Sequence, residues 1–253
     1  MSSRRILIFI LIILALSLIS ILYPKLTHPI TKNYYLTEQA ILERVIDGDT
    51  IEAKVGNETW KIRILGINTP EKNMPQYQQA TDFLKQFQGK SITLLRDKED
   101  TDKYNRKLRY IFFNDRFLNK EILQNGLANS YYTQDLIYER ELLAAEKQAK
   151  QNSLGIWNKS EKLCATSHCI KLQELNYTNE FFILKNSCTF SCNMDGWFVK
   201  DSGRNVFYLQ SMKSAEEKTY YSTLTKAKTD IWQNHDHFFL FDDQGYLVLY
   251  YEY

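Results

Sequence analysis

The chain has 253 residues, of which 44% are hydrophobic and 14% aromatic. These values exclude a disordered tail protein, a collagen and a small disulfide scaffold, and they allow one large or two small domains. The 32 basic and 30 acidic side chains give a net charge of +2, so a nucleic-acid partner must be held by a local basic site rather than by overall charge. Residues 161–253 carry nine basic and twelve acidic side chains, which argues against a nucleic-acid clamp there.

The N-terminal segment, residues 1–24, is predicted to be a signal anchor. Arg4 and Arg5 precede an uncharged, mostly apolar run over residues 6–22. At ~1.5 Å per residue this run spans roughly 26 Å, slightly less than the ~30 Å core of a bilayer. It is longer than the apolar part of most cleaved signal peptides, and no A-x-A-like site follows it, so an anchor is favoured over cleavage. The charge bias predicts a cell-membrane protein whose later residues are extracellular, or a secreted protein if the segment is cleaved.

Residues 25–39 are predicted to be a linker, and residues 40–159 a first domain. Alternating apolar positions between turn signals predict strands at residues 41–46, 50–55, 59–67, 92–95 and 108–113. Apolar residues with helical spacing predict helices at residues 77–88, 118–124 and 134–151. Five strands with helices between them predict a small closed β-barrel of the OB type.

Residues 160–178 are polar and are predicted to be a cysteine-containing linker to a second domain, residues 179–253. Strand-like segments follow at residues 181–184, 196–199, 206–209, 238–241 and 247–253. Short strands separated by turn signals predict a β-sandwich. The fold class is therefore mainly β with helices.

The four cysteines lie in and just after this linker, as Cys164, Cys169, Cys188 and Cys192. Disulfides are the expected state outside the membrane. Four thiols can also form a zinc site, with His168 nearby. The sequence does not choose among the three possible pairings.

Chemically useful side chains gather in three clusters of the first domain. The clusters are Asp47-Gly48-Asp49-Thr50, then Arg63 with Asn68-Thr69-Pro70-Glu71, then Asp102-Lys103-Tyr104-Asn105-Arg106. Together they offer oxygen ligands for a hard cation, two guanidinium groups and a further carboxylate. These groups suit phosphodiester hydrolysis, in which a metal polarises the phosphoryl group, arginines neutralise charge and a carboxylate orients water.

Residues 41–157 resemble staphylococcal-nuclease-like (thermonuclease) domains along their whole length. The resemblance is carried by VIDGDTIEA (45–53), IRILGINTPE (62–71), DKYNRKLRYI (102–111), NGLA (125–128) and ELLAAEKQAKQNSLGIW (141–157). It implies a five-stranded OB-fold barrel and calcium-dependent hydrolysis of DNA and RNA with little sequence preference. It also implies products with 5′-hydroxyl and 3′-phosphate ends.

The resemblance also implies a role for particular residues. Arg63, Glu71 and Arg106 match the catalytic residues of the family: the arginines would clamp the scissile phosphate, and Glu71 would hold the attacking water. The implied calcium ligands are Asp49, the Thr69 main-chain carbonyl, Asn68, and Asp47 through water. Tyr104 and Tyr132 would touch the nucleotide by phosphate bonding and base stacking, although partial core packing is the alternative for each.

Three positions depart from the family pattern. Asn68 stands where the family has a second metal carboxylate, so one negative charge is missing. The segment 72–79 is shorter than the mobile loop of the best-known member. Asn105 replaces a frequent Gly, which Asn tolerates better than most residues if φ is positive.

Residues 180–253 resemble a lamin-tail domain, an immunoglobulin-like sandwich. The matching stretches are EFFILKN (180–186), MDGWFVKD (194–201) and DIWQNHDHFFLFDDQGYLV (230–248). The resemblance implies a binding or spacer module whose partner is unknown. His235-Asp236-His237 has the composition of a metal site, but alternate histidines entering a strand are interpreted as surface residues.

The leading hypothesis is a membrane-anchored, outward-facing, non-specific endonuclease. The alternative is an inactive nuclease-like fold that binds nucleic acid or a surface polymer. Arg63, Glu71 and Arg106 favour the enzyme, because a binding module has no need of Glu71. Asn68 favours the alternative.

Overall fold

The structure is a computed structural model that describes residues 36–131, 135–203, 205–221 and 237–252. The predicted signal anchor, residues 1–24, lies outside the described residues, as does most of the predicted linker. Leu36–Tyr253 form one compact unit. In the part of the chain that the structure describes, no helix is both long and apolar enough to cross a membrane.

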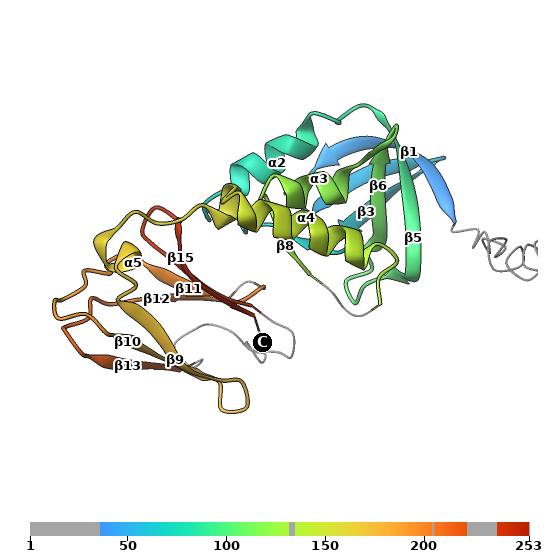
Figure 1. Ribbon diagram of the computed structural model, residues 1–253. Helices are drawn as coiled ribbons and strands as arrows, with labels where there is room; N and C mark the ends of the chain where they lie inside the picture. Colours follow the sequence, from blue (N-terminus) through green and yellow to red (C-terminus); the bar gives the residue numbers. More distant parts are fainter. Residues whose placement is uncertain (1–35, 132–134, 204, 222–236, 253) are drawn as a thin grey trace, which may run out of the picture. The chain divides into compact units, whose positions relative to one another are not determined.

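The first domain is built on a closed five-stranded barrel. Its strands are β1 (Thr37–Val45), β2 (Thr50–Val55), β3 (Glu58–Ile64), β5 (Ser91–Thr101) and β6 (Lys107–Phe113). They pair in the order β3-β2-β1-β5-β6, followed by the short β7 (Arg116–Phe117), and the parallel pairing of β3 with β6 closes the barrel (Figure 1). A two-residue strand, β4 (Ile67–Asn68), pairs with β8 (Asn129–Ser130) outside this sheet. The predicted barrel is confirmed.

Two strands of the first domain extend well beyond their predicted bounds. β1 begins at Thr37, inside the predicted linker, because Thr37 to Ile41 pair with β5. β5 continues to Thr101 although its second half is charged. Those charges find partners: Asp100 bonds Lys107 Nζ at 2.5 Å and Arg109 Nη2 at 2.7 Å. The spacing of apolar residues could not predict the end of β5, because ion pairs stabilise it.

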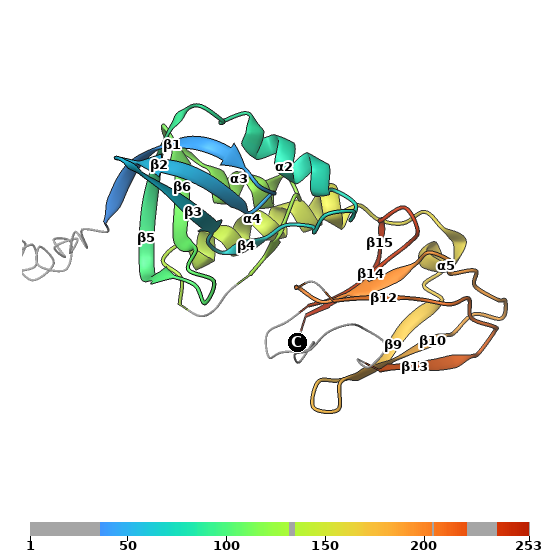
Figure 2. The same ribbon diagram turned by 180° about the vertical axis from the view of Figure 1, so that it is seen from behind.

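Three helices pack against the barrel and complete its core. They are α2 (Tyr77–Lys85), α3 (Leu118–Gln124) and α4 (Glu139–Gln151). α3 has the predicted bounds, whereas α2 and α4 are shorter than predicted. Figure 2 shows β1, β2 and β3 in front of α3 and α4. The inward strand positions and the apolar helix faces form one buried cluster, which includes Leu42, Ile51, Ile62, Leu94, Ile111, Leu84, Ile122 and Leu142.

The second domain is a sandwich of two antiparallel sheets. One sheet has the order β13 (Glu217–Tyr221), β10 (Phe181–Asn186), β9 (Ile170–Asn176), and the other the order β12 (Val206–Tyr208), β11 (Phe198–Lys200), β14 (His237–Phe241), β15 (Leu247–Glu252). The Phe182 ring of the first sheet contacts Phe207 and Phe238 of the second, with centroids 5.2 Å apart in both cases. The sheets therefore share a core.

The predicted linker over residues 160–178 is wrong in part, because it holds α5 (Leu163–Thr166) and β9. β9 was missed because its alternation of apolar and polar residues is interrupted at Gln173, where the pairing with β10 shifts register. The four cysteines join this segment to the residues after β10 as two disulfides, Cys164–Cys192 and Cys169–Cys188. The disulfides link the start of the domain to its first sheet, and all four sulfurs are engaged in them.

A third apolar cluster joins the two domains. It comprises Ala149, Ile156 and Trp157 from the end of the first domain with Phe198, Phe239, Phe241 and Leu247 from the sandwich. The Trp157 ring lies 5.6 Å from Phe239 and 5.2 Å from Tyr250. The connecting residues also pair with β15, since Leu247 N–H donates to Asn158 O at 2.7 Å and Ser160 N–H donates to Leu247 O at 2.9 Å.

Candidate active site

Strand register brings the first two sequence clusters together with the third. Thr50, the first residue of β2, lies opposite Arg63 in β3. β3 also pairs in parallel with β6, with Ile62 opposite Lys107, so Arg106 lies immediately before the paired residues. Three residues far apart in sequence, Thr50, Arg63 and Arg106, thus meet at one end of the barrel.

The turn between β1 and β2 carries two carboxylates. The Asp49 N–H donates to Asp47 Oδ1 at 3.0 Å, which fixes the turn. A Cβ at Gly48 would lie 2.6 Å from Ala80 Cβ and 2.7 Å from Thr69 Oγ1. Glycine therefore lets α2 and Thr69 approach the turn closely, and any larger residue would push them apart.

Asp49 is the centre of the hydrogen-bond network. It is buried, and its Oδ2 accepts from the Thr69 N–H at 3.2 Å and lies 3.2 Å from Arg63 Nη2. Its Oδ1 accepts from the Thr50 hydroxyl at 3.0 Å. The Thr50 Oγ1 in turn accepts from Arg106 Nη1 at 3.4 Å. The two arginines are therefore connected through one carboxylate and one hydroxyl.

A tight turn holds Arg106. Asp102 Oδ2 accepts from Arg106 Nε at 2.7 Å, and Asp102 Oδ1 accepts from the main-chain N–H groups of Tyr104 and Arg106, both at 2.9 Å. Asn105 adopts a positive φ of 61° within this turn, the conformation in which Asn is a good substitute for Gly. The Arg106 guanidinium lies 5.6 Å from the Tyr104 ring centre.

The pKa of Asp47 is raised from its ordinary value. Burial disfavours its charged form, and the neighbouring carboxylate of Asp49 disfavours it further. The main-chain N–H of Asp49 and the charge of Arg63 act in the opposite direction. The net result is that Asp47 loses its proton less readily than an exposed Asp does.

A cleft of about 390 Å³ opens beside the arginines. Arg63 and Arg106 line it together with Tyr104, which is 70% exposed, and Tyr131. The predicted Tyr132 lies outside the described residues. Tyr131 was missed because two tyrosines stand side by side there, and the pattern of the sequence does not single out Tyr131.

The segment after β3 carries the remaining site residues. Asn68, in β4, accepts from Arg63 Nη2 through Oδ1 at 3.3 Å and donates through Nδ2 to the Ser202 main-chain carbonyl. Glu71 is partly buried and follows Thr69 in the same loop, and its carbonyl accepts from the Met74 N–H at 2.9 Å. The predicted ligands Asp47, Asp49, Asn68 and Thr69 are thus gathered next to Arg63.

Of the histidine segment, the structure describes His237. His235 and Asp236 lie outside the described residues. The interpretation of His237 as a surface residue is wrong: it is 5% exposed, and its Nδ1 lies 2.6 Å from Ser202 Oγ. Ser202 itself was missed, because nothing in the sequence relates it to Asn68, 134 residues earlier.

Known proteins share the first domain. The sequence profile of the staphylococcal nuclease homologues matches residues 61–159. An uncharacterized protein of Methanocaldococcus jannaschii is 34% identical over 46% of this chain and 69% of its own length. The thermonuclease of Staphylococcus intermedius is 31% identical over 48% of this chain and 77% of its own, and that of Staphylococcus hyicus is 31% identical over 46% and 73%. With its closed barrel and these relatives, the chain belongs to the family of staphylococcal nuclease homologues.

Proposed function

We propose that this protein is a calcium-dependent endonuclease that hydrolyses DNA and RNA without sequence preference. The observation that carries the proposal is the joint placement of Arg63 and Arg106, connected through Asp49 and Thr50 beside an open cleft. Two fixed guanidinium groups are a good match for a phosphodiester, because each offers a planar pair of N–H donors. The family relationship supports a nuclease, and the cleft supplies aromatic surface for nucleotides.

The site residues have different roles in the proposed hydrolysis. Arg63 and Arg106 would hold the scissile phosphate and offset the charge that develops on its oxygens in the transition state. Glu71, in the same loop as Thr69, would orient the attacking water. Because Arg63 is held by Asp49 and Arg106 by Asp102, little reorganisation is needed when the substrate arrives.

The donor set fits a calcium ion. Calcium prefers oxygen ligands, and Asp49, Asn68 and the Thr69 carbonyl supply them, with Asp47 beside them. Burial and then the neighbouring Asp49 carboxylate raise the pKa of Asp47. When bound, the ion would polarise the phosphoryl group.

Asn68 bears on how much calcium the site needs. A neutral amide still offers one oxygen, but the site has one negative charge fewer than it would with Asp, and charge count tunes calcium affinity. Extracellular sites work with dissociation constants of ~10⁻⁴–10⁻³ M. We therefore expect an active enzyme with a high calcium requirement. Asn68→Asp should lower the calcium concentration for half-maximal cleavage, but it should also lower the maximal rate, because a carboxylate cannot donate to the Ser202 carbonyl.

A binding module is the second candidate, and one observation favours it. Both polar atoms of the Asn68 side chain already have protein partners, Arg63 and Ser202. If the amide never turns toward a metal, the site binds nucleic acid without cutting it.

The test is cleavage of plasmid and of RNA by residues 36–253, with calcium and with a chelator. Calcium-dependent nicking of both substrates, with 3′-phosphate ends, is the expected result. Binding of both without cleavage at ~10 mM calcium, well above the ~10⁻³ M of weak extracellular sites, would leave the binding module as the function.

We also propose a location for the protein and a module type for its second domain. The apolar run over residues 6–22 supports anchoring in the cell membrane with the catalytic domain outside. Full-length protein should then sediment with membranes and resist alkaline carbonate, whereas a soluble form starting near residue 25 would establish cleavage. Two antiparallel sheets with a shared core are what a lamin-tail-like module requires, and its partner is unknown.

A further inference from the structure

The second domain contacts the candidate active site at Asn68. Its Nδ2 donates to the main-chain carbonyl of Ser202, and its Oδ1 accepts from Arg63 Nη2 at 3.3 Å. A flipped amide would put its oxygen against that carbonyl and its NH₂ group against the guanidinium. The two partners therefore determine how the amide is oriented.

The loop that presents the carbonyl is held firmly inside the second domain. Ser202 is 4% exposed and its Oγ lies 2.6 Å from Nδ1 of the buried His237. The preceding Asp201 accepts from the Asn205 N–H at 3.1 Å and from its side-chain amide at 2.6 Å. The carbonyl is thus a fixed acceptor rather than the tip of a free loop.

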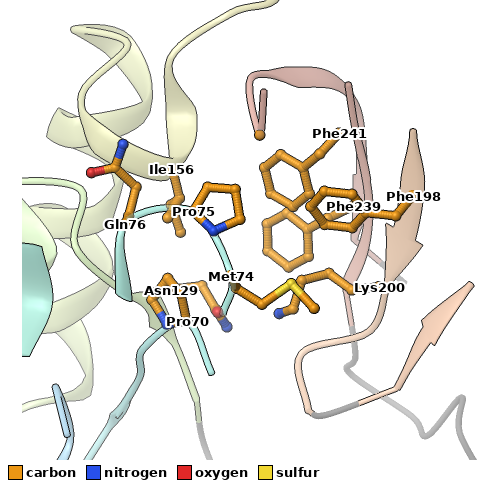
Figure 3. A pocket seen from close by; sticks show the side chains of 11 residues that line it. Pro70, Met74, Pro75, Gln76, Asn129, Ile156, Phe198, Lys200, Phe239 and Phe241 are labelled. Carbon is orange, nitrogen blue, oxygen red and sulfur yellow. The ribbon is translucent and has the colours of Figure 1, made fainter. Parts of the chain in front are cut away.

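The segment on the other side of Asn68 is packed against the same domain. Figure 3 shows Met74 and Pro75, just after Glu71, facing Phe239 and Phe241 of β14. The cavity among these side chains measures about 20 Å³, room for about one water molecule. A Cβ at Gly245 would lie 2.0 Å from Pro75 Cγ, so the two surfaces meet closely there as well.

We propose that the second domain positions the catalytic site. Asn68 is the link, because its side chain bonds both Ser202 of the second domain and Arg63 of the site. The inference rests on the proposed nuclease activity and names a further positioning residue for it. It also accounts for the residue type at position 68. An aspartate there would turn a carboxylate oxygen toward the Ser202 carbonyl and repel it, whereas an asparagine can serve both neighbours.

The test separates the two domains sterically at a position away from the catalytic groups. In residues 36–253, Gly245→Ala drives a methyl group into Pro75, and adding Pro75→Gly relieves that clash. Gly245 has a φ of +81°, so Gly89→Ala, at φ +78° with nothing within 4 Å, is the matched control for backbone strain. Pro75→Gly alone is the control for the double variant.

Two readouts are measured on every variant: kcat and KM for DNA cleavage, and hydrogen exchange of the Thr69 amide, which is bonded to Asp49. Gly245→Ala should lower kcat by ~10-fold, less than the ~10²–10³-fold of deleting a charge-stabilising donor, with KM little changed. Thr69 exchange should become faster. The double variant should recover both readouts, and Gly89→Ala and Pro75→Gly should match the parent.

A double-mutant cycle identifies Asn68 as the link. In an Asn68→Ala background, Gly245→Ala should produce no further fall in kcat, because the hydrogen bonds of Asn68 to Arg63 and Ser202 have already been removed. An equal fall in both backgrounds would overturn the proposal, as would unchanged Thr69 exchange in Gly245→Ala. Should the parent not cleave at all, the proposed function fails by itself, and Thr69 exchange still decides whether the second domain holds this segment.

Discussion

Thr50 is the residue by which the structure connects the two arginines, and Thr50→Val tests that connection. The substitution keeps the shape of the side chain and removes its hydroxyl. Thr50 is 3% exposed, and its hydroxyl donates to Asp49 at 3.0 Å and accepts from Arg106 at 3.4 Å. The contact with Arg106 is at the long limit for a hydrogen bond, so the loss comes mainly from Asp49.

A hydrogen bond to a charged group contributes ~1.5–3 kcal/mol. If the whole loss appears in the transition state, it corresponds to a fall of ~10–150-fold in kcat/KM. Part of it will instead lower the free energy of unfolding, because a buried carboxylate loses a donor. We therefore expect kcat/KM for plasmid cleavage to fall by ~10-fold, near the low end of this range, together with a lower midpoint of urea unfolding.

Thr59→Val is the matched control. The Thr59 hydroxyl also donates to a carboxylate, Glu43 Oε2, at 3.0 Å, but on the exposed face of the neighbouring strand. It should leave cleavage within about twofold of the parent, ~0.4 kcal/mol. If Thr50→Val stays within the same limit, the connection through Thr50 has no part in catalysis and the reasoning is refuted.

Three further outcomes are expected. Glu71→Gln and Arg106→Ala should each reduce cleavage by ~10²–10³-fold or more with an unchanged circular dichroism spectrum, and an active Glu71→Gln would remove Glu71 from the mechanism. The Lys107 ammonium and then the Arg109 guanidinium hold the pKa of Asp100 at about 2. Since this lies below the ordinary ~3.9, the ion pairs stabilise the fold above about pH 4, and their contribution is lost as the pH falls toward 2. Asp100→Asn should therefore flatten acid unfolding in that window, and an identical acid profile would contradict the assignment. The intact mass should lie about four hydrogens below the reduced mass, and Cys169→Ser with Cys188→Ser, which opens a disulfide between residues 19 positions apart, should destabilise the second domain by ~3 kcal/mol. Four free thiols with chelatable zinc would overturn this.

The sequence predicted the elements whose stability comes from local pattern. α3 has the predicted bounds because its apolar spacing and the following Gly126 are both local signals. β9 was missed because its stability comes from pairing with β10 and from disulfides to residues further along the chain. β13, with its polar sequence EKTYY, was missed for the same reason, since only its pairing with β10 makes it a strand.

The same distinction applies to the site. Arg63, Asn68 and Arg106 were named from motifs, and the barrel register brings them together. The Asn68 contact with Ser202 could not be predicted, because it depends on how a second domain packs against the first. The substitution at position 68 therefore looked like a lost charge in the sequence and proves to be a polar contact in the structure.

The pairing of Leu247 with Asn158 and Ser160 has a consequence for the order of events during synthesis. Domains generally fold from the N-terminus as the chain emerges, so the barrel can close while β15 is still unmade. The contacts that join the domains need Phe239, Phe241 and Leu247, which are translated well after the barrel. A nascent barrel would then exist for a time with Asn68 lacking its second partner. If Asn68 positions Arg63, the hydrolytic centre matures only after the second domain has been made, which delays activity beyond the closure of the barrel.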